Sequence, residues 1–124
     1  MKIEIKTTEA AFKKRVVRWL RANNIFYWST DGAKVRGIPD IMAIRNRNFF
    51  AFELKRSHKE AIKKDARTTC QRNFLRKLSG GGGMGLFVYP ENFGRVCEFL
   101  EDALTRPCSV KELHKDFILE NHDG

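Results

Sequence analysis

Apolar residues near the start of the chain recur at helical spacing. Between positions 8 and 23 they occupy i, i+4, i+7 and i+8, namely Phe12, Val16, Trp19 and Leu20. At about 100° per residue these positions cover roughly a third of the helix circumference, and the opposite side carries Lys14, Arg15, Arg18 and Arg21. The pattern predicts an amphipathic helix over 8–23. Glu9 falls inside the apolar stripe at the first turn, where an apolar residue is expected.

Three short segments rich in apolar and aromatic residues follow this helix. They are "IFYWS" (25–29), "DIMAIR" (40–45) and "FFAFELK" (49–55), and each is typical of a strand. The intervening "NRN" (46–48) indicates a hairpin between the last two, because Asn tolerates positive φ. We expect Tyr27, Trp28 and Phe49 to lie in the core, and the alternative is that they stack on nucleic-acid bases.

The hairpin fixes where its polar residues lie. With Asn46 and Arg47 as the two turn residues, opposed positions sum to 93, so that Asp40 faces Glu53 on one side of the sheet. A three-residue loop would shift the register by one position and leave both acids at the same end of the hairpin. Lys55 follows Glu53 by two residues and therefore shares its face.

The second half of the chain adds helices and one strand. Residues 56–68 are too polar for a core and predict a mobile basic segment. A helix is expected over 69–78, with Gln71 at the centre of its apolar side. "GLFVYP" (85–90) indicates a short buried strand, and a helix over 91–104 follows. After Pro107, "SVKE" fits a capping box and predicts a last helix ending near Asn121.

This order of elements predicts an α/β fold in which helices flank a small mixed sheet. The 124 residues form a single domain, with a core over about 8–104 and a helical tail over about 107–124. The chain lacks an apolar run of the roughly 18 residues that span a bilayer, and "MKIEIK" does not resemble a signal peptide. Three scattered cysteines without a CxxC pair indicate reduced thiols inside a cell.

Charge is distributed unevenly along the chain, whose net charge is +9. Residues 55–77 hold nine Lys and Arg against two acids, a net +7, whereas residues 91–124 hold four against eight, a net −4. A polyanion such as nucleic acid would explain a basic middle, and so would a merely solvated basic face. The cations that we expect to contact DNA are Arg36, Arg56, Lys59, Lys63, Lys64, Arg67 and Arg72.

Polar residues on inward faces carry the chemistry. Taken singly, Glu9 could favour its helix N-terminus, Gln71 could bind loop backbone, and Asp40 could be a turn residue. Jointly they indicate a site, because two opposed and buried carboxylates would hardly both ionise without a cation. Carboxylates with a neighbouring carbonyl are hard ligands that suit Mg²⁺ or Mn²⁺.

The motif "GIPD", a gap of twelve residues, then "ELK" resembles that of PD-(D/E)xK nucleases. With the helical acid Glu9 and the helical Gln71 in "CQRNFLRKL", the chain resembles the virus-type replication-repair nuclease group (VRR-NUC), and in particular its small stand-alone members of phage type. The resemblance covers residues 8–90. It implies a restriction-endonuclease-like core, divalent-metal-dependent cleavage of branched DNA such as a Holliday junction or flap, a homodimer, and the cytoplasm of a bacterial host.

The resemblance also implies roles for individual residues. Asp40 and Glu53 would hold the metal with the carbonyl of Leu54, and Glu9 would act directly or through a water. Lys55 would orient the attacking water or stabilise developing charge, and Gln71 would position Lys55 or the phosphate. A non-catalytic DNA-binding module that retains the nuclease fold is the alternative function, and a sequence-specific restriction enzyme is a third.

Overall fold

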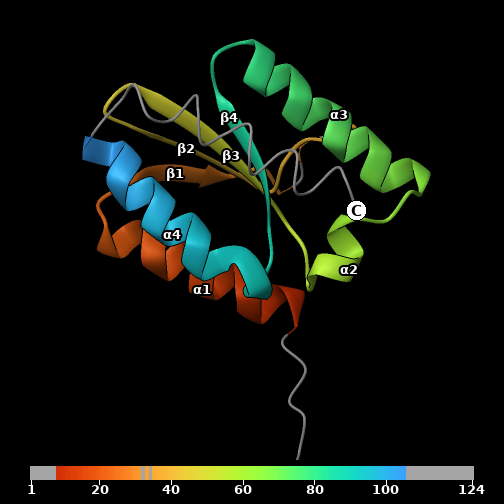
Figure 1. The fold of residues 1–124 in the computed structure, drawn as a ribbon, viewed down its shortest axis with the longest axis horizontal. Coiled ribbons are helices and arrows are strands. Elements are labelled where there is room, and N and C mark those ends of the chain that lie inside the picture. Colours follow the sequence, from red (N-terminus) through yellow and green to blue (C-terminus); the bar gives the residue numbers. More distant parts are fainter. Residues whose placement is uncertain (1–7, 32, 34, 106–124) are drawn as a thin grey trace, which may run out of the picture.

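The computed structural model describes residues 8–31, 33 and 35–105 of the chain. Its helices are α1 (Glu9–Ala22), α2 (His58–Ala61), α3 (Ala66–Gly80) and α4 (Pro90–Thr105). Its strands are β1 (Phe26–Ser29), β2 (Ile41–Arg45), β3 (Asn48–Leu54) and β4 (Met84–Val88), and they form one sheet in the order β1-β2-β3-β4 (Figure 1). The helix expected after Pro107 lies outside the described residues.

The sheet is mixed, because β1, β2 and β3 pair antiparallel whereas β4 pairs parallel with β3. The prediction of an α/β fold with a small mixed sheet between helices is confirmed, and the arrangement is consistent with a restriction-endonuclease-like core. No described helix has both the length and the apolar character that crossing a membrane requires.

The predicted hairpin and its register are confirmed. Asn46 and Arg47 have φ values of 50° and 67°, the conformation of a two-residue turn with positive φ at both positions. Ile41 is paired with Phe52 and Met42 with Ala51, so opposed positions sum to 93.

Helices α1 and α4 cover one face of the sheet (Figure 1). Thr8 caps α1 by accepting a hydrogen bond from the backbone N–H of Ala11, and the buried stripe of α1 packs against Phe93 of α4. The strand residues of this core are fully or almost fully buried: Ile41, Ala43, Phe50, Phe52, Leu54, Met84, Leu86 and Val88. Burial of this apolar surface is the main stabilising contribution to the fold.

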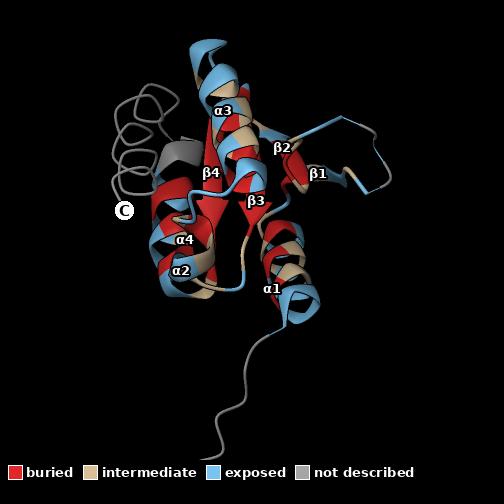
Figure 2. Ribbon diagram, turned by 90° about the vertical axis from the view of Figure 1, so that its right-hand side faces the viewer, coloured by how far each residue is buried: buried red, intermediate tan, exposed pale blue. Residues whose placement is uncertain are grey.

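Helix α3 covers part of the opposite face (Figure 2). Its Leu75 packs there with Phe87 of β4. A Cβ atom at Gly85 would lie 2.8 Å from a methyl group of Leu75, so glycine allows α3 to approach β4 closely.

The prediction of a mobile segment over 56–68 is wrong, because α2 lies within it and α3 begins at Ala66. Ser57 caps α2 by accepting from the backbone N–H of Glu60, which is the capping-box spacing in "SHKE". Asp65 caps α3 through the N–H of Thr68 at 2.7 Å. Ala61 is fully buried in a cluster with Leu75, Phe87 and Tyr89, and this burial helps to anchor α2.

Candidate metal and nucleic-acid site

Asp40 and Glu53 lie next to each other on the α3 side of the sheet. Extending the β2–β3 register by one residue places them directly opposite each other. The backbone carbonyl of Asp40 accepts from the N–H of Thr30 at 3.0 Å, and its carboxylate Oδ2 accepts from the N–H of Leu54 at 2.8 Å. One hydrogen bond therefore holds the Asp40 carboxylate against the end of β3, and the other ties the Asp40 backbone to Thr30, directly after β1.

Glu53 is buried, with 4% of its surface exposed. Its Oε1 atom accepts a hydrogen bond from the side-chain amide of Gln71 at 2.7 Å, whereas no described residue donates a hydrogen bond to its buried Oε2 atom. The side-chain oxygen of Gln71 is likewise buried without a described donor. A buried oxygen that accepts no hydrogen bond lowers the stability of the fold, so a bound cation or a further donor would stabilise this site.

The surroundings of Glu53 raise its pKa to about 9. Burial is the largest cause, and both the negative charge of Asp40 and a hydrogen bond between the two carboxyl groups add to it, whereas the positive charges of Lys55 and Arg67 act in the opposite direction. At neutral pH the Glu53 carboxyl is therefore protonated unless a cation compensates its charge. The carboxyl oxygens of Asp40 and Glu53, including the Glu53 Oε2 atom that receives no hydrogen bond, are ligands that suit a small divalent cation.

The carbonyl of Leu54 faces the same site. The backbone N–H of Lys55 bonds to the carbonyl of Val88 in β4 at 2.9 Å. Because a trans peptide directs its N–H and C=O to opposite sides, the Leu54 carbonyl points away from β4 and towards Asp40. The structure thus groups Asp40, Glu53, the Leu54 carbonyl and Gln71, and the charge of the half-buried Lys55 acts on Glu53.

Glu9 does not join this group. It is exposed at the first position of α1, and the described residues include no cluster of three His, Cys, Asp or Glu side chains able to hold a metal. The helical phase of Glu9 matches the apolar stripe, but the core begins one turn later, at Phe12. Its negative charge there favours the helix N-terminus, which is the alternative explanation for this residue.

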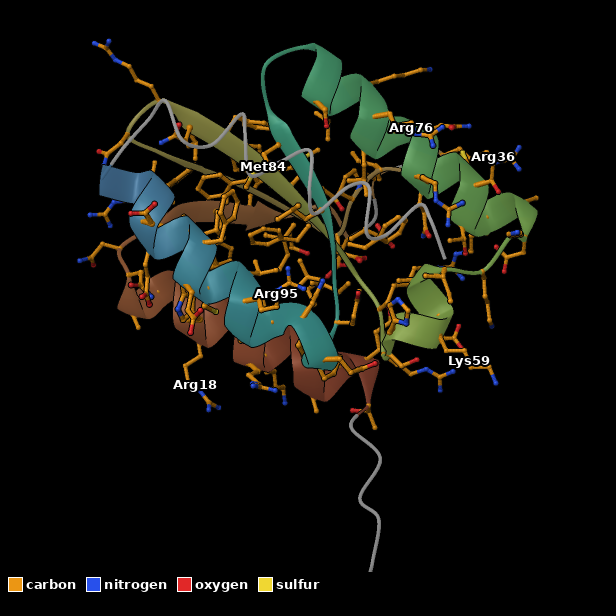
Figure 3. The ribbon with its side chains drawn as sticks, viewed as in Figure 1. Arg18, Arg36, Lys59, Arg76, Met84 and Arg95 are labelled. Carbon is orange, nitrogen blue, oxygen red and sulfur yellow. The ribbon has the colours of Figure 1, made fainter. Side chains whose placement is uncertain are left out.

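Most of the predicted DNA-contacting cations are exposed. Arg36, Arg56, Lys59, Lys63, Lys64 and Arg67 all project to solvent, although Glu60 forms ion pairs with Lys63 at 2.8 Å and with Arg56 at 3.6 Å. Figure 3 shows Arg36 beside α3 and Lys59 on α2, apart from Arg18 on α1.

Arg72 is not part of this exposed set. Its guanidinium donates to the backbone carbonyls of Ala61 and Lys63 and lies 5.8 Å from the ring centre of Phe87. Partial burial and the neighbouring charge of Arg76 lower its pKa. Arg72 therefore fastens α2 to α3, and we remove it from the predicted DNA contacts.

The aromatic residues of β1 differ from expectation. Tyr27 packs against the core, but Trp28 is 43% exposed and Phe26 67% exposed, on the side of the sheet that carries Asp40 and Glu53. The prediction that Trp28 lies in the core is therefore wrong, and Phe49 is half-buried on this same side. Alternation along "FYW" separates Tyr27 from its two neighbours, which is the sequence signal for this division.

The class that the fold and site define is an α/β domain in which a buried carboxyl group, Glu53, lies opposite a half-buried one, Asp40, at the end of a β-hairpin. No protein-family model matches the chain, and neither a search of curated proteins nor a search of solved structures gave a match. The function is therefore argued from the site itself.

Proposed function

We propose that this protein is a divalent-metal-dependent endonuclease that hydrolyses phosphodiester bonds in DNA. The observation that carries the proposal is the opposed pair Asp40 and Glu53, in which a buried carboxylate oxygen of Glu53 receives no hydrogen bond from a donor of the described residues. For folding alone, an apolar side chain at position 53 would give a more stable protein than a buried carboxyl group. A function that uses the carboxylate explains why an ionisable residue occupies this buried position.

Each residue of the site has a part in this proposal. Asp40, Glu53 and the Leu54 carbonyl would hold Mg²⁺ or Mn²⁺, which, when bound, supplies charge neutralisation at the phosphate and a more acidic water. Lys55 would orient the attacking water or stabilise negative charge that develops on the phosphate. Gln71 would fix the orientation of the Glu53 carboxylate through the 2.7 Å hydrogen bond.

The exposed cations of α2 and the start of α3 would contact the DNA backbone. Lys59, Lys64 and Arg67 follow the strand that carries Glu53, so phosphates beside the scissile bond would lie within their reach. Preference for branched DNA, a homodimer that cuts paired strands, and an intracellular location are proposed from the resemblance of the motif to VRR-NUC nucleases.

A non-catalytic DNA-binding module is the second candidate. The observation that favours it is the exposed position of Glu9, which leaves the described site with two acids instead of the three that the motif resemblance implies. The two candidates differ in whether any DNA is cut.

Cleavage of labelled DNA tests the proposal. Four-way junctions, flaps, single strands and duplexes are each incubated with Mg²⁺ and with Mn²⁺, using the wild type and Asp40→Asn. The Asn oxygen can still accept from the N–H of Leu54, so the variant should fold. We expect the wild type to cut at least one substrate and Asp40→Asn to be at least about 10³-fold slower, equivalent to roughly 4 kcal/mol of activation free energy. A wild type that binds DNA but cuts none of these forms with either metal would establish the binding module.

A further inference from the structure

The α3 side of the sheet is only partly covered, and aromatic rings lie on the uncovered part. Phe26, Trp28 and Ile44 are 67%, 43% and 41% exposed. The ring centres of Phe26 and Trp28 are 5.8 Å apart, and those of Trp28 and Phe49 are 6.3 Å apart. Three rings thus form a continuous surface across β1 to β3, which is more than single scattered apolar residues would give.

Two hollows beside α3 adjoin this surface. One, of about 410 Å³, is lined by Phe49, Phe74, Lys77, Leu78 and the glycines 81–83. The other, of about 430 Å³, shares Phe74 and Lys77 with the first and is also lined by Arg36. We call the surface formed by Phe26, Trp28, Phe49 and Phe74, with the cations Arg36 and Lys77, the aromatic groove.

The loop that carries Arg36 is fixed in place beside α3. Gly37 has a φ of +79°, and a Cβ atom there would lie 2.9 Å from both the carbonyl oxygen and the sulfur of Cys70. Glycine is therefore required both for the backbone conformation and for the close approach. This contact holds Arg36 at the wall of the groove, three residues before Pro39 and four before Asp40.

The aromatic groove leads to the carboxylate pair. Phe49 and Glu53 are on the same strand and the same face, four residues and about 13 Å apart. Met42 and Ala51, paired with each other, lie between them. A strand of nucleic acid resting on the rings would therefore extend towards Asp40 and Glu53 within a few nucleotides.

We propose that the aromatic groove binds unpaired nucleotides by stacking their bases on Phe26, Trp28 and Phe49, while Arg36 and Lys77 contact the phosphates. The inference rests on the proposed nuclease function, because it identifies the strand held beside the carboxylate pair as single-stranded. Aromatic rings accept the faces of all bases, so binding would depend little on sequence.

A second copy of the chain is the competing occupant, and the groove suits it less well. Standard protein interfaces bury about 800 Å² and some 20 to 30 residues per partner. Among the described residues, this face exposes three large apolar side chains, Phe26, Trp28 and Ile44, which is a small apolar area for such an interface. Two copies meeting here would also bring Arg36 and Lys77 of each close to those of the other, in a chain of net charge +9. A polyanion turns the same charges into attraction.

Binding without divalent metal tests the inference separately from cleavage. In EDTA, fluorescence anisotropy compares a labelled single strand of mixed sequence with an abasic strand of equal length and charge. We expect the wild type to bind the base-bearing strand about tenfold or more tightly, because stacking contributes at each base. Failure of the proposed nuclease would appear as absent cutting with Mg²⁺ or Mn²⁺, and this binding difference would not be affected.

The double variant Phe26→Leu/Trp28→Leu separates stacking from apolar contact. It keeps apolar area but removes two rings, so the preference for the base-bearing strand should disappear while weak binding to the abasic strand remains. Val35→Ala, at a 53% exposed residue outside the groove, is the control and should behave as wild type. A preference retained by the double variant, or equal binding of both strands by the wild type, would overturn the inference. A dimer that forms through this face, detected by sedimentation and unable to bind the base-bearing strand, would also overturn the inference.

Trp28 supplies a readout that needs no change in the groove. The chain has two tryptophans, and Trp19→Phe leaves Trp28 as the only one. Trp28 emission should be quenched by the base-bearing strand and not by the abasic strand. Equal emission with both strands would contradict stacking, even if the double leucine variant failed to fold.

Discussion

The two faces of the sheet differ in what covers them. On the face of α1 and α4, Phe12, Val16 and Leu20 are fully buried against apolar strand residues. On the face of α3, Glu53 and Gln71 are buried polar residues, and Phe26 and Trp28 remain exposed. One complete apolar layer is sufficient to form a core under a sheet of this size, which leaves the other face available for polar chemistry and for contacts with a ligand.

The largest expected difference between the faces is in stability. Phe12→Ala removes a fully buried ring that packs on Phe93, and we expect it to lower the free energy of unfolding by about 3–5 kcal/mol. Phe26→Ala removes a ring that is 67% exposed and should change stability by no more than about 0.5 kcal/mol. Urea denaturation measures both, and similar losses in the two variants would contradict the division.

The pH dependence of stability should reveal the cost of the carboxylate pair. Because the folded-state pKa of Glu53 is raised to about 9 from 4.5, the folded protein binds this proton more tightly than the unfolded chain. Without divalent metal, this contribution is fully present below pH 4.5 and is lost as pH rises towards 9, by up to about 1.4 kcal/mol per pH unit. Thermal melts in EDTA across this range measure the loss.

Glu53→Gln is the matched variant for that experiment. The amide is uncharged at all pH values, so the variant should lose less stability than the wild type between pH 5 and 8. The same slope in both proteins would show that Glu53 does not titrate in the way that its burial requires.

A smaller effect is expected from the cations beside the site. Lys59→Glu/Lys64→Glu should weaken DNA binding about tenfold at low salt and reduce its salt dependence, because fewer counterions are released. Lys63 is left unchanged because it pairs with Glu60. Lys14→Glu/Arg18→Glu makes the same change in charge on α1, and gel-shift titrations should show less weakening. Equal weakening by both pairs would mean that only net charge matters.

The sequence predicted those features that depend on local rules. The turn at Asn46 and Arg47 determined the hairpin register, and the register alone placed Asp40 opposite Glu53. The apolar stripe of α1 followed from its period, and Gln71 was correctly expected on the inward side of α3.

The errors concern features that tertiary packing decides. The alternation along β1 places Trp28 on the opposite face from Tyr27, but whether that face is covered depends on how far α3 extends over the sheet, which the sequence of β1 does not show. Arg72 is directed inward because its guanidinium donates hydrogen bonds to two backbone carbonyls and lies against the ring of Phe87. Glu9 has the phase of the buried stripe but is exposed before the core begins, and its action on the metal, directly or through a water, stays a prediction.

Calorimetric titration with Mn²⁺ tests the central claim, that Asp40 and Glu53 share a divalent cation. At pH 7 the wild type should bind the ion and release close to one proton, measured from the heats in two buffers, because Glu53 is protonated beforehand. Asp40→Asn and Glu53→Gln should lose this binding and its proton release. No binding to the wild type, or the same affinity in all three proteins, would show that the two carboxylates do not form a metal site.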